Sequence, residues 1–263
     1  MSTLTLAMQD SATMLRRNLR RQVRYVSLVV FQFAIPIVFL LLFVYVLGGT
    51  MGAGLGDGPG SRAEYLDYVT PAVLLIAIVG VAQITPIMVA MDMTGGIIDR
   101  FRTMPIARVS VLTGHVLGSL IQTVIVVFAV LGVALLLGFE ATAGPAEWVA
   151  MFGVVVMVAL AITWLSVALG LAARSVETAS NVPLPLILLP FLSSGFVPVD
   201  SMPAAMRWFA EYQPFTPIIE VFRGLLTASP IGNYGVIAVA WSAGIALLGY
   251  VWAKRLFNRA SQR

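Results

Sequence analysis

A short charged segment at residues 95–106 is the part of this chain best suited to contact another protein. Asp99, Arg100 and Arg102 stand there among apolar side chains, and Pro105 ends the segment. Both flanking stretches are long and apolar enough to cross a membrane, so the segment must lie at a membrane surface. A loop that only reversed the chain would need a few turn residues. The composition instead predicts a short surface helix that contacts something outside the membrane.

Candidates for catalytic or metal chemistry are few. The sequence lacks the P-loop, zinc-protease and nucleophile-elbow motifs, and it has no cysteine and a single histidine, His115. His115 begins an apolar stretch, where a polar anchor at the membrane surface is the simplest role. Asp92 also lies at the end of its stretch, whereas proton relays place carboxylates within the membrane. We predict no catalytic residue, metal site or cofactor in this chain, so that any energy source lies elsewhere.

The composition indicates a protein whose solvent is lipid. Hydrophobic residues make up 59% of the chain and charged residues 11%, against roughly 25% charged residues in soluble domains. The net charge of +4 would raise nucleic acid as a partner of a soluble protein. Here the positions of the basic residues explain the charge as membrane topology, so we expect no nucleic-acid partner. The fold class is therefore an all-α integral membrane protein.

Six apolar segments are long enough to span a bilayer, which takes about 20 residues per helix. The third segment is long enough to tilt. The fifth contains Pro183, Pro185 and Pro190, which predict a kink or a break. The predicted spans are 25–47, 69–91, 109–137, 148–173, 182–199 and 232–253, in one membrane domain of residues 25–263.

The basic residues predict the orientation of these spans. Lys and Arg are concentrated in the N-terminal segment, in residues 100–108, at Arg174 and near the C-terminus, whereas the alternate loops hold only Arg62, Arg207 and Arg223. Loops rich in Lys and Arg stay in the cytoplasm. We therefore expect a multi-pass protein of the cell membrane, with both termini and the segment 95–106 on the cytoplasmic side.

Residues 1–24 are predicted to form an amphipathic helix in the membrane interface. Apolar residues recur at helical spacing and fall on one stripe, and arginines cover the opposite face. Such a helix lies flat, with its arginines toward anionic lipid or a protein partner. A simple positive anchor is the alternative. The stripe is Leu4, Met8, Ala12, Leu15, Leu19 and Val23, and the arginines are Arg16, Arg17, Arg20, Arg21 and Arg24.

Proline pairs mark several predicted helix starts. Thr70-Pro71 lies at the start of the second span, and Gly144-Pro145 comes before the fourth. Met202-Pro203 and Thr216-Pro217 begin two short apolar helices that run to about Tyr212 and Leu226. Both are too short to cross, which suggests a re-entrant or outer-leaflet hairpin. Within the second helix, Glu220 and Arg223 are three residues apart and could form an ion pair.

Mildly polar residues inside the spans have two possible roles. They can form hydrogen bonds between helices, which is the commoner role, or they can give a weakly polar lining to a pathway for an amphiphile. The candidates for the pathway are Gln32, Gln83, Thr85, Ser193 and Ser194.

Three patches resemble the ABC type-two permease family, in particular permeases of the daunorubicin-resistance type. They are Gly-Gly-Ile-Ile-Asp-Arg-Phe-Arg-Thr-Met-Pro-Ile at 95–106, Ser-Ser-Gly-Phe-Val-Pro-Val-Asp-Ser-Met-Pro at 193–203, and Gln-Pro-Phe-Thr-Pro at 213–217 with Arg-Gly-Leu-Leu at 223–226. The resemblance covers nearly the whole chain in order. It is specific for the family and says little about the substrate.

The resemblance implies a transport subunit, not an enzyme. The segment after span two would be a coupling helix seated on a separate P-loop ATPase, which would bind ATP and Mg. The N-terminal helix would be a connector helix that touches the same ATPase through Arg16, Arg17, Arg20 and Arg21. Two ATPases and a second permease copy, as a homodimer, would complete the exporter. The coupling contacts would be Asp99, Arg100, Phe101, Arg102, Met104 and Pro105.

The resemblance also implies that spans one, two and five line the route between the two permeases, and that the hairpin at 203–226 closes the outer side. Several functions stay open. The first is ATP-driven export of an amphiphilic drug, natural product or lipid, and a second is export of polysaccharide or another glycan. A membrane-embedded lipid-modifying enzyme is less expected, because such enzymes need clustered acidic or histidine residues at the membrane face. A structural factor with a degenerate permease fold is the remaining alternative.

Overall fold

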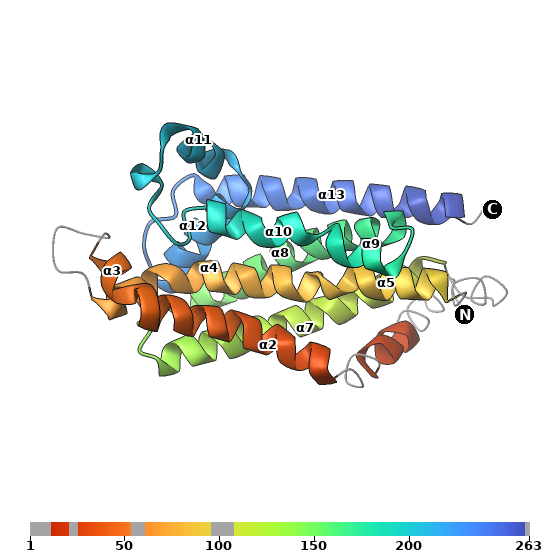
Figure 1. Cartoon of the computed structure of the whole chain (residues 1–263), viewed down its shortest axis with the longest axis horizontal. Coiled ribbons are helices and arrows are strands. Elements are labelled where there is room, and N and C mark those ends of the chain that lie inside the picture. Colours follow the sequence, from red (N-terminus) through yellow and green to blue (C-terminus); the bar gives the residue numbers. More distant parts are fainter. Residues whose placement is uncertain (1–11, 21–25, 54–60, 96–107, 261–263) are drawn as a thin grey trace.

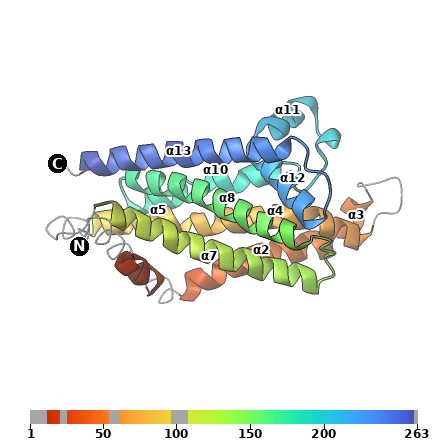
Figure 2. The same cartoon turned by 180° about the vertical axis from the view of Figure 1, so that it is seen from behind.

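The structure is a computed structural model that describes residues 12–20, 26–53, 61–95 and 108–260. Within these residues the chain is helical and contains no strand. A short helix at residues 12–20 precedes a bundle of long helices that run side by side (Figures 1 and 2). Five of the described helical segments are long and apolar enough to cross a membrane. They are 29–52, 62–94, 112–136, 145–172 and 234–259.

The first long segment changes its helical type near one end. It consists of α2 (Val26–Leu41), a π-helical turn η1 (Leu42–Leu47) and α3 (Gly48–Gly52). The π turn brings Phe43 against Phe196, with ring centroids 4.5 Å apart. Phe39 and Phe191 complete this aromatic cluster, which joins η1 to the broken segment described below.

The second long segment, α4 (Arg62–Ala82) and α5 (Ile84–Thr94), forms the centre of the bundle. Most of α4 is buried, consistent with a helix that is apolar on every side. Its predicted start at Thr70-Pro71 is wrong, because the helix begins at Arg62, directly after Ser61, which forms a capping box with Glu64. Thr70 Oγ1 instead donates to Leu66 O within the helix. The break at Gln83 precedes Pro86, whose nitrogen has no hydrogen to donate to a carbonyl of the preceding turn.

Three more long helices surround this centre. They are α7 (Arg108–Leu136), α8 (Pro145–Ala172) and α13 (Tyr234–Ala260). Gly144 and Pro145 begin α8, as predicted. The exposed side chains of α13 include Val236, Leu247 and Leu248, and those of α2 are equally apolar. Such an exterior suits lipid, and the backbone polar groups are satisfied within the helices.

The predicted fifth span does not form one long helix. After α9 (Val176–Asn181) come α10 (Leu184–Leu188), the 3-10 turn η2 (Leu189–Leu192) and a loop. Pro183, Pro185 and Pro190 lack the amide hydrogens that a continuous helix requires. The described residues therefore hold five long spanning helices and one shorter apolar stretch at 176–192, and the count of six spans stays a prediction.

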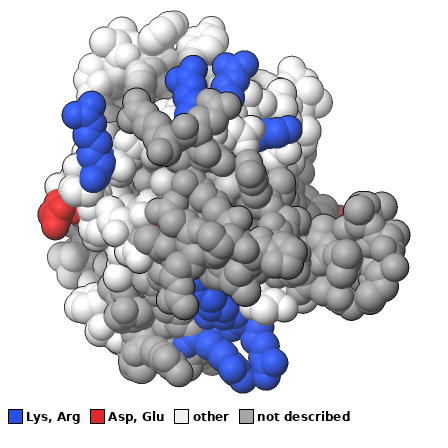
Figure 3. Space-filling view, turned by 90° about the vertical axis from the view of Figure 1, so that its right-hand side faces the viewer, with Lys and Arg blue, Asp and Glu red and all other residues white. Residues whose placement is uncertain are grey.

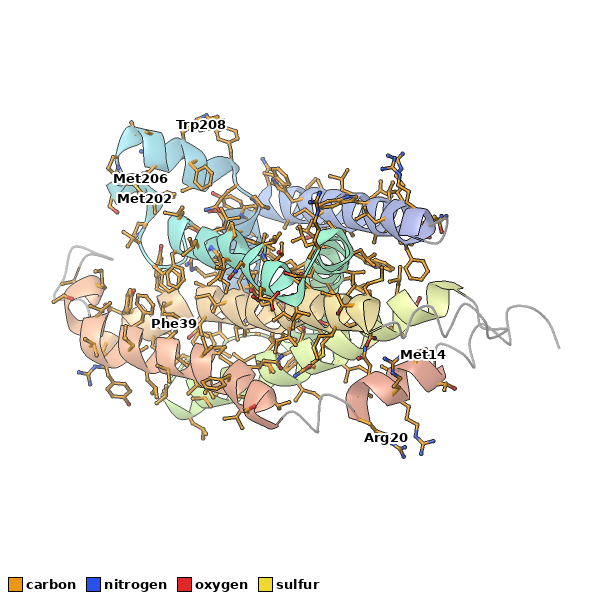
Figure 4. The ribbon with its side chains drawn as sticks, turned by 45° about the vertical axis from the view of Figure 1, so that its right-hand side comes forward. Met14, Arg20, Phe39, Met202, Met206 and Trp208 are labelled. Carbon is orange, nitrogen blue, oxygen red and sulfur yellow. The ribbon has the colours of Figure 1, made fainter. Side chains whose placement is uncertain are left out.

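Two short helices follow the turn η3 (Val199–Ser201). α11 (Ala204–Tyr212) protrudes from the bundle, and Trp208 on it is 65% exposed and points away (Figures 1 and 4). On this helix the Glu211 hydrogen bond and the Asp200 carboxylate raise the pKa of the exposed Arg207. α12 (Phe215–Leu226) is instead buried between α4, α8 and α13. The two helices thus differ sharply in environment.

Replacing Gly249 with Leu is expected to destabilise the bundle by about 1–3 kcal/mol. A Cβ at this position would lie 2.6 Å from the backbone nitrogen of Leu165, so α13 would have to move away from α8. Gly244→Leu, on the same helix, is the matched control, because no atom lies within 4 Å of its added Cβ. Thermal unfolding in detergent compares the two variants, and equal melting temperatures would contradict the close packing.

Candidate functional site

Seven of the ten predicted ATPase contacts lie outside the described residues. This applies to Asp99, Arg100, Phe101, Arg102, Met104 and Pro105, and to Arg21 of the N-terminal helix. The structure does describe the helices on either side of the segment 96–107, since α5 ends at Thr94 and α7 begins at Arg108.

A groove of about 260 Å³ lies between α2, α4, α5 and α10. Aliphatic and aromatic side chains form most of its walls, and Gln32 and Gln83 are its polar members. Gly80 widens the groove, because no atom lies within 4 Å of a Cβ added there. The lining residues are Phe31, Gln32, Ile35, Pro36, Phe39, Ile76, Val79, Gly80, Gln83, Ile84 and Ile187. Segments predicted as spans one, two and five therefore meet at one apolar groove.

Both groove amides also bond to neighbouring segments. Gln83 Nε2 donates to Pro183 O at 2.6 Å, which ties the α4–α5 break to the start of α10. Gln122 on α7 donates to Gln32 Oε1 on α2. Both glutamines thus form hydrogen bonds between segments, which was the commoner of the two predicted roles. Each amide still has donor or acceptor positions that a further partner could use.

Thr85 lies away from the groove, in a polar cluster between α5, α7 and α8. Its Oγ1 donates to Ser119 Oγ at 3.2 Å, and Thr163 Oγ1 lies 3.4 Å from the same atom. A cavity of about 10 Å³ adjoins the cluster, with Asn18 and His115 on its far wall. A cavity of this size is near the lower limit for holding one water molecule.

A buried ionic cluster joins the N-terminal helix to the bundle, and sequence reasoning missed it. Arg17 Nη2 donates to both carboxylate oxygens of Asp92, at 3.1 and 2.9 Å. His115 Nε2 lies 3.1 Å from Asp92 Oδ2. Asp92 is only 1% exposed, while the Arg17 side chain is 34% exposed. Arg17 was predicted to contact an ATPase, yet here it binds its own chain.

Asn18 fixes the state of His115 in this cluster. Asn18 Nδ2 donates to Gly114 O at 3.1 Å, and a carbonyl can only accept, so the amide nitrogen must face it. The same nitrogen lies 3.1 Å from His115 Nδ1 and can donate its other hydrogen there. His115 then carries a proton on Nε2 and donates to Asp92. In the sequence, Asp92 and His115 each stand at the end of an apolar stretch, and this position was the only indication that they could pair.

The N-terminal helix packs on a different face from the predicted stripe. Met14 and Asn18 are buried against α7, whereas Ala12 of the predicted stripe is exposed. Figure 4 shows Met14 on the side that faces the bundle and Arg20 pointing away from it. Arg16 and Arg20 are exposed, and Leu15 and Leu19 are half-buried. The described part of the helix therefore packs one face on the bundle and leaves Arg16 and Arg20 exposed.

A second polar cluster lies at the opposite end, between α4, α12 and the loop after η2. Arg223 pairs with Glu220 and also donates to Tyr68 O at 3.1 Å and Ser194 O at 3.3 Å. Its guanidinium lies 4.1 Å from the centroid of the Tyr68 ring. Ser194 Oγ donates to Glu220 Oε1 at 2.6 Å. Ser194 therefore lies in this cluster and not in the groove.

The loop that follows η2 is pinned closely to α4. Ser193 Oγ accepts from Gly195 N at 3.2 Å, which fixes a tight turn. A Cβ on Gly195 would lie 2.5 Å from Ala72 Cβ, so only glycine allows this approach. Ser193 is fully buried here and does not reach the groove. Of the five predicted pathway residues, Gln32 and Gln83 line the groove, and Thr85, Ser193 and Ser194 do not.

Replacing Arg223 with Met should destabilise the protein by about 2 kcal/mol, because Glu220 and two carbonyls would lose their charged donor. The matched control is Arg207→Met, whose ion pairs are exposed and should contribute little. Chemical or thermal unfolding in detergent measures the difference. Arg223→Met together with Glu220→Gln should recover part of the loss, and equal stability of both single variants would contradict this assignment.

Basic side chains gather at the end of the bundle that carries the N-terminal helix (Figure 3). The described exposed residues there include Arg16, Arg20, Arg174, Lys254, Arg255 and Arg259. We call this the basic end, and the opposite end, which carries Arg223 and α11, the α11 end. Exposed acidic residues Glu64, Glu140, Asp200 and Glu211 lie toward the α11 end.

Comparison with known proteins agrees with this architecture. Residues 10–227 match the model of the ABC-2 type transporter family. A daunorubicin resistance ABC transporter permease protein of Streptomyces coeruleorubidus is 29% identical over 214 residues, which cover 81% of this chain and 70% of the relative. A probable doxorubicin resistance ABC transporter permease protein of Mycobacterium tuberculosis is 25% identical over 251 residues, covering 95% of this chain and 89% of the relative.

The family match includes the groove and both polar clusters and ends before α13. The matches confirm the predicted resemblance. They favour a multi-pass transport subunit over the alternative of a membrane-embedded enzyme. The chain belongs to the ABC-2 type transporter family and is an ABC transporter permease.

Proposed function

We propose that this chain is the transmembrane subunit of an ATP-driven exporter that moves an amphiphilic compound out of the cytoplasm. The groove between α2, α4, α5 and α10 carries this proposal. Its walls are aliphatic and aromatic, with Gln32 and Gln83 as isolated polar groups, which is the usual composition of a site for an amphiphilic ligand. A glycan would need many hydrogen-bonding groups along its path, so the groove favours an amphiphile.

We further propose that the basic end faces the cytoplasm. The positive-inside rule supports this orientation, since exposed Lys and Arg gather there. Both termini would then be cytoplasmic, with the shorter apolar stretch at 176–192 as a broken fifth span. The α11 end would be the outer side. α11 would lie at the outer membrane surface with its exposed Trp208 and Tyr212 at headgroup level, and α12 would be the membrane-inserted half of the hairpin.

The energy would come from a separate P-loop ATPase. The segment 96–107 connects the inner ends of α5 and α7, so a push on it would reach both helices. α5 borders the groove, and α7 contacts α5 through the polar cluster of Thr85 and Ser119. We propose two ATPase copies and a homodimer of this chain. The second permease would cover the groove on the exposed side of α2, where Val30, Phe31 and Val38 face outward.

The names of the relatives suggest which compounds to try first. Daunorubicin and doxorubicin are aromatic amphiphiles, and a resistance permease for each is similar to this chain. Cells that express the chain with its ATPase should accumulate less of these fluorescent compounds than cells whose ATPase lacks the P-loop lysine. Equal accumulation in the two strains, for these and for other amphiphiles, would count against the proposed function.

A further inference from the structure

The cluster around Asp92 joins three segments that are far apart in the sequence. Arg17 comes from the N-terminal helix, Asp92 from the last turn of α5 and His115 from the second turn of α7. α5 and α7 are the helices that flank the segment 96–107. The carboxylate is almost fully buried, so it must be matched by a cation and by hydrogen bonds to be tolerated.

Close packing accompanies these polar contacts. A Cβ on Gly114 would lie 2.7 Å from Met14 Cβ, so the N-terminal helix approaches α7 as closely as a glycine allows. One turn further along α7, a Cβ on Gly118 would lie 3.5 Å from Asn18 Cβ. The two helices thus contact along at least two turns, and the ionic cluster lies at the edge of that contact.

The polar partners are specific to one position of the N-terminal helix. A shift by one turn would take Arg17 away from Asp92 and break both hydrogen bonds between the guanidinium and the buried carboxylate. Separating a buried carboxylate from a charged hydrogen-bond donor is unfavourable. Packing alone would allow more sliding, because apolar contacts are not directional.

We propose that Asp92 is a positioning residue that locks the N-terminal helix to the inner ends of α5 and α7, so that these three elements move as one body during transport. The direction of the driving force rests on the proposed function, in which an ATPase pushes the segment between α5 and α7. The locking itself is a property of this chain alone. In this arrangement a displacement of either helix also moves the exposed Arg16 and Arg20.

A disulfide can measure this lock, because the natural chain contains no cysteine. A disulfide needs Cβ atoms about 3.5–4.5 Å apart, and the pair Asn18→Cys with Gly118→Cys satisfies this. In membrane vesicles under mild oxidation, this pair should cross-link readily. Asn18→Cys with Gly132→Cys is the matched control on the same helix, with an added Cβ that no atom approaches within 4 Å, and it should cross-link little.

Asp92→Asn should slow the cross-linking by about tenfold, because the charged hydrogen bonds to Arg17 are lost. Arg17→Gln should have a similar effect. This variant changes the N-terminal helix and leaves the buried Asp92 in place, so the bundle itself should still fold. Arg20→Gln, on the exposed face, should leave the rate unchanged. An unchanged rate in both Asp92→Asn and Arg17→Gln would overturn the proposal.

Transport supplies the second readout. Asp92→Asn should lower ATP-dependent drug efflux, and the disulfide between the two cysteines introduced at positions 18 and 118 should restore it until a reductant is added. A defect that persists in the fully cross-linked protein would also overturn the proposal, because Asp92 would then act in another way. If the unmodified chain transports no compound with any ATPase, the proposed function fails, while the cross-linking rates still decide whether Asp92 locks the helix.

Discussion

Gly80→Trp is expected to abolish drug transport, with a loss of at least about tenfold, while the protein remains folded. Gly80 lines the groove between α2, α4, α5 and α10, and no atom lies within 4 Å of a Cβ added there. An indole can therefore enter the groove without displacing the backbone, and it would occupy much of the volume of about 260 Å³. Efflux of a fluorescent amphiphile from whole cells measures the effect.

Gly132→Trp on α7 is the matched control for this variant. Its added Cβ also meets no atom within 4 Å, but Gly132 does not line the groove. Both variants should melt near the wild-type temperature in detergent, and only Gly80→Trp should lose transport. Full transport by Gly80→Trp would show that the compound does not pass through this groove.

Replacing both Arg100 and Arg102 with Glu is expected to uncouple transport and to remove the ATPase from the purified complex. These arginines lie in the charged segment between α5 and α7, where the ATPase would bind, and reversed charges repel a surface that had been complementary. Membrane insertion should be retained, because the spans themselves are unchanged. Co-purification of a tagged ATPase, followed by a transport assay, tests both effects.

Arg255→Glu provides the comparison at the same end of the molecule. Arg255 is exposed near the end of α13 and was not assigned to an ATPase contact. It should leave both the association and the transport close to wild type. If the double variant at 100 and 102 keeps its ATPase and its transport, the assignment of a coupling helix to this segment is wrong.

Local signals predicted many helix ends correctly. Gly144-Pro145 begins α8, and the short helices α11 and α12 end at Tyr212 and Leu226, as the sequence indicates. Thr70-Pro71 misled because proline also occurs inside a buried membrane helix, and the true cap at Ser61 lies in a polar stretch that had been assigned to a loop. The prolines of 182–199 indicated a disrupted helix, but its division into α10, η2 and a pinned loop depends on contacts with α4 and α12.

The site was less predictable, because its contacts join residues that are distant in the sequence. Asp92 and His115 each appeared as a polar residue near a membrane surface, and nothing local indicated that Arg17 reaches them both in one cluster. The apolar stripe of the N-terminal helix predicted a lipid-facing side, whereas Met14 and Asn18 show that a second face packs on α7. Ser193 and Ser194 were candidates for the pathway, with hydrogen bonding between helices as the commoner role, and their contacts place Ser194 in the cluster of Arg223 and Ser193 in the adjoining loop.

Reconstitution of the purified chain into liposomes tests the central claim most directly. With the partner ATPase on the outer surface, added ATP should drive a fluorescent amphiphile into the liposomes. Liposomes with this chain alone, or with an ATPase that lacks the P-loop lysine, should accumulate none above the passive level. Accumulation that needs no ATPase, or no ATP-dependent accumulation of any amphiphile by the complete complex, would contradict the account.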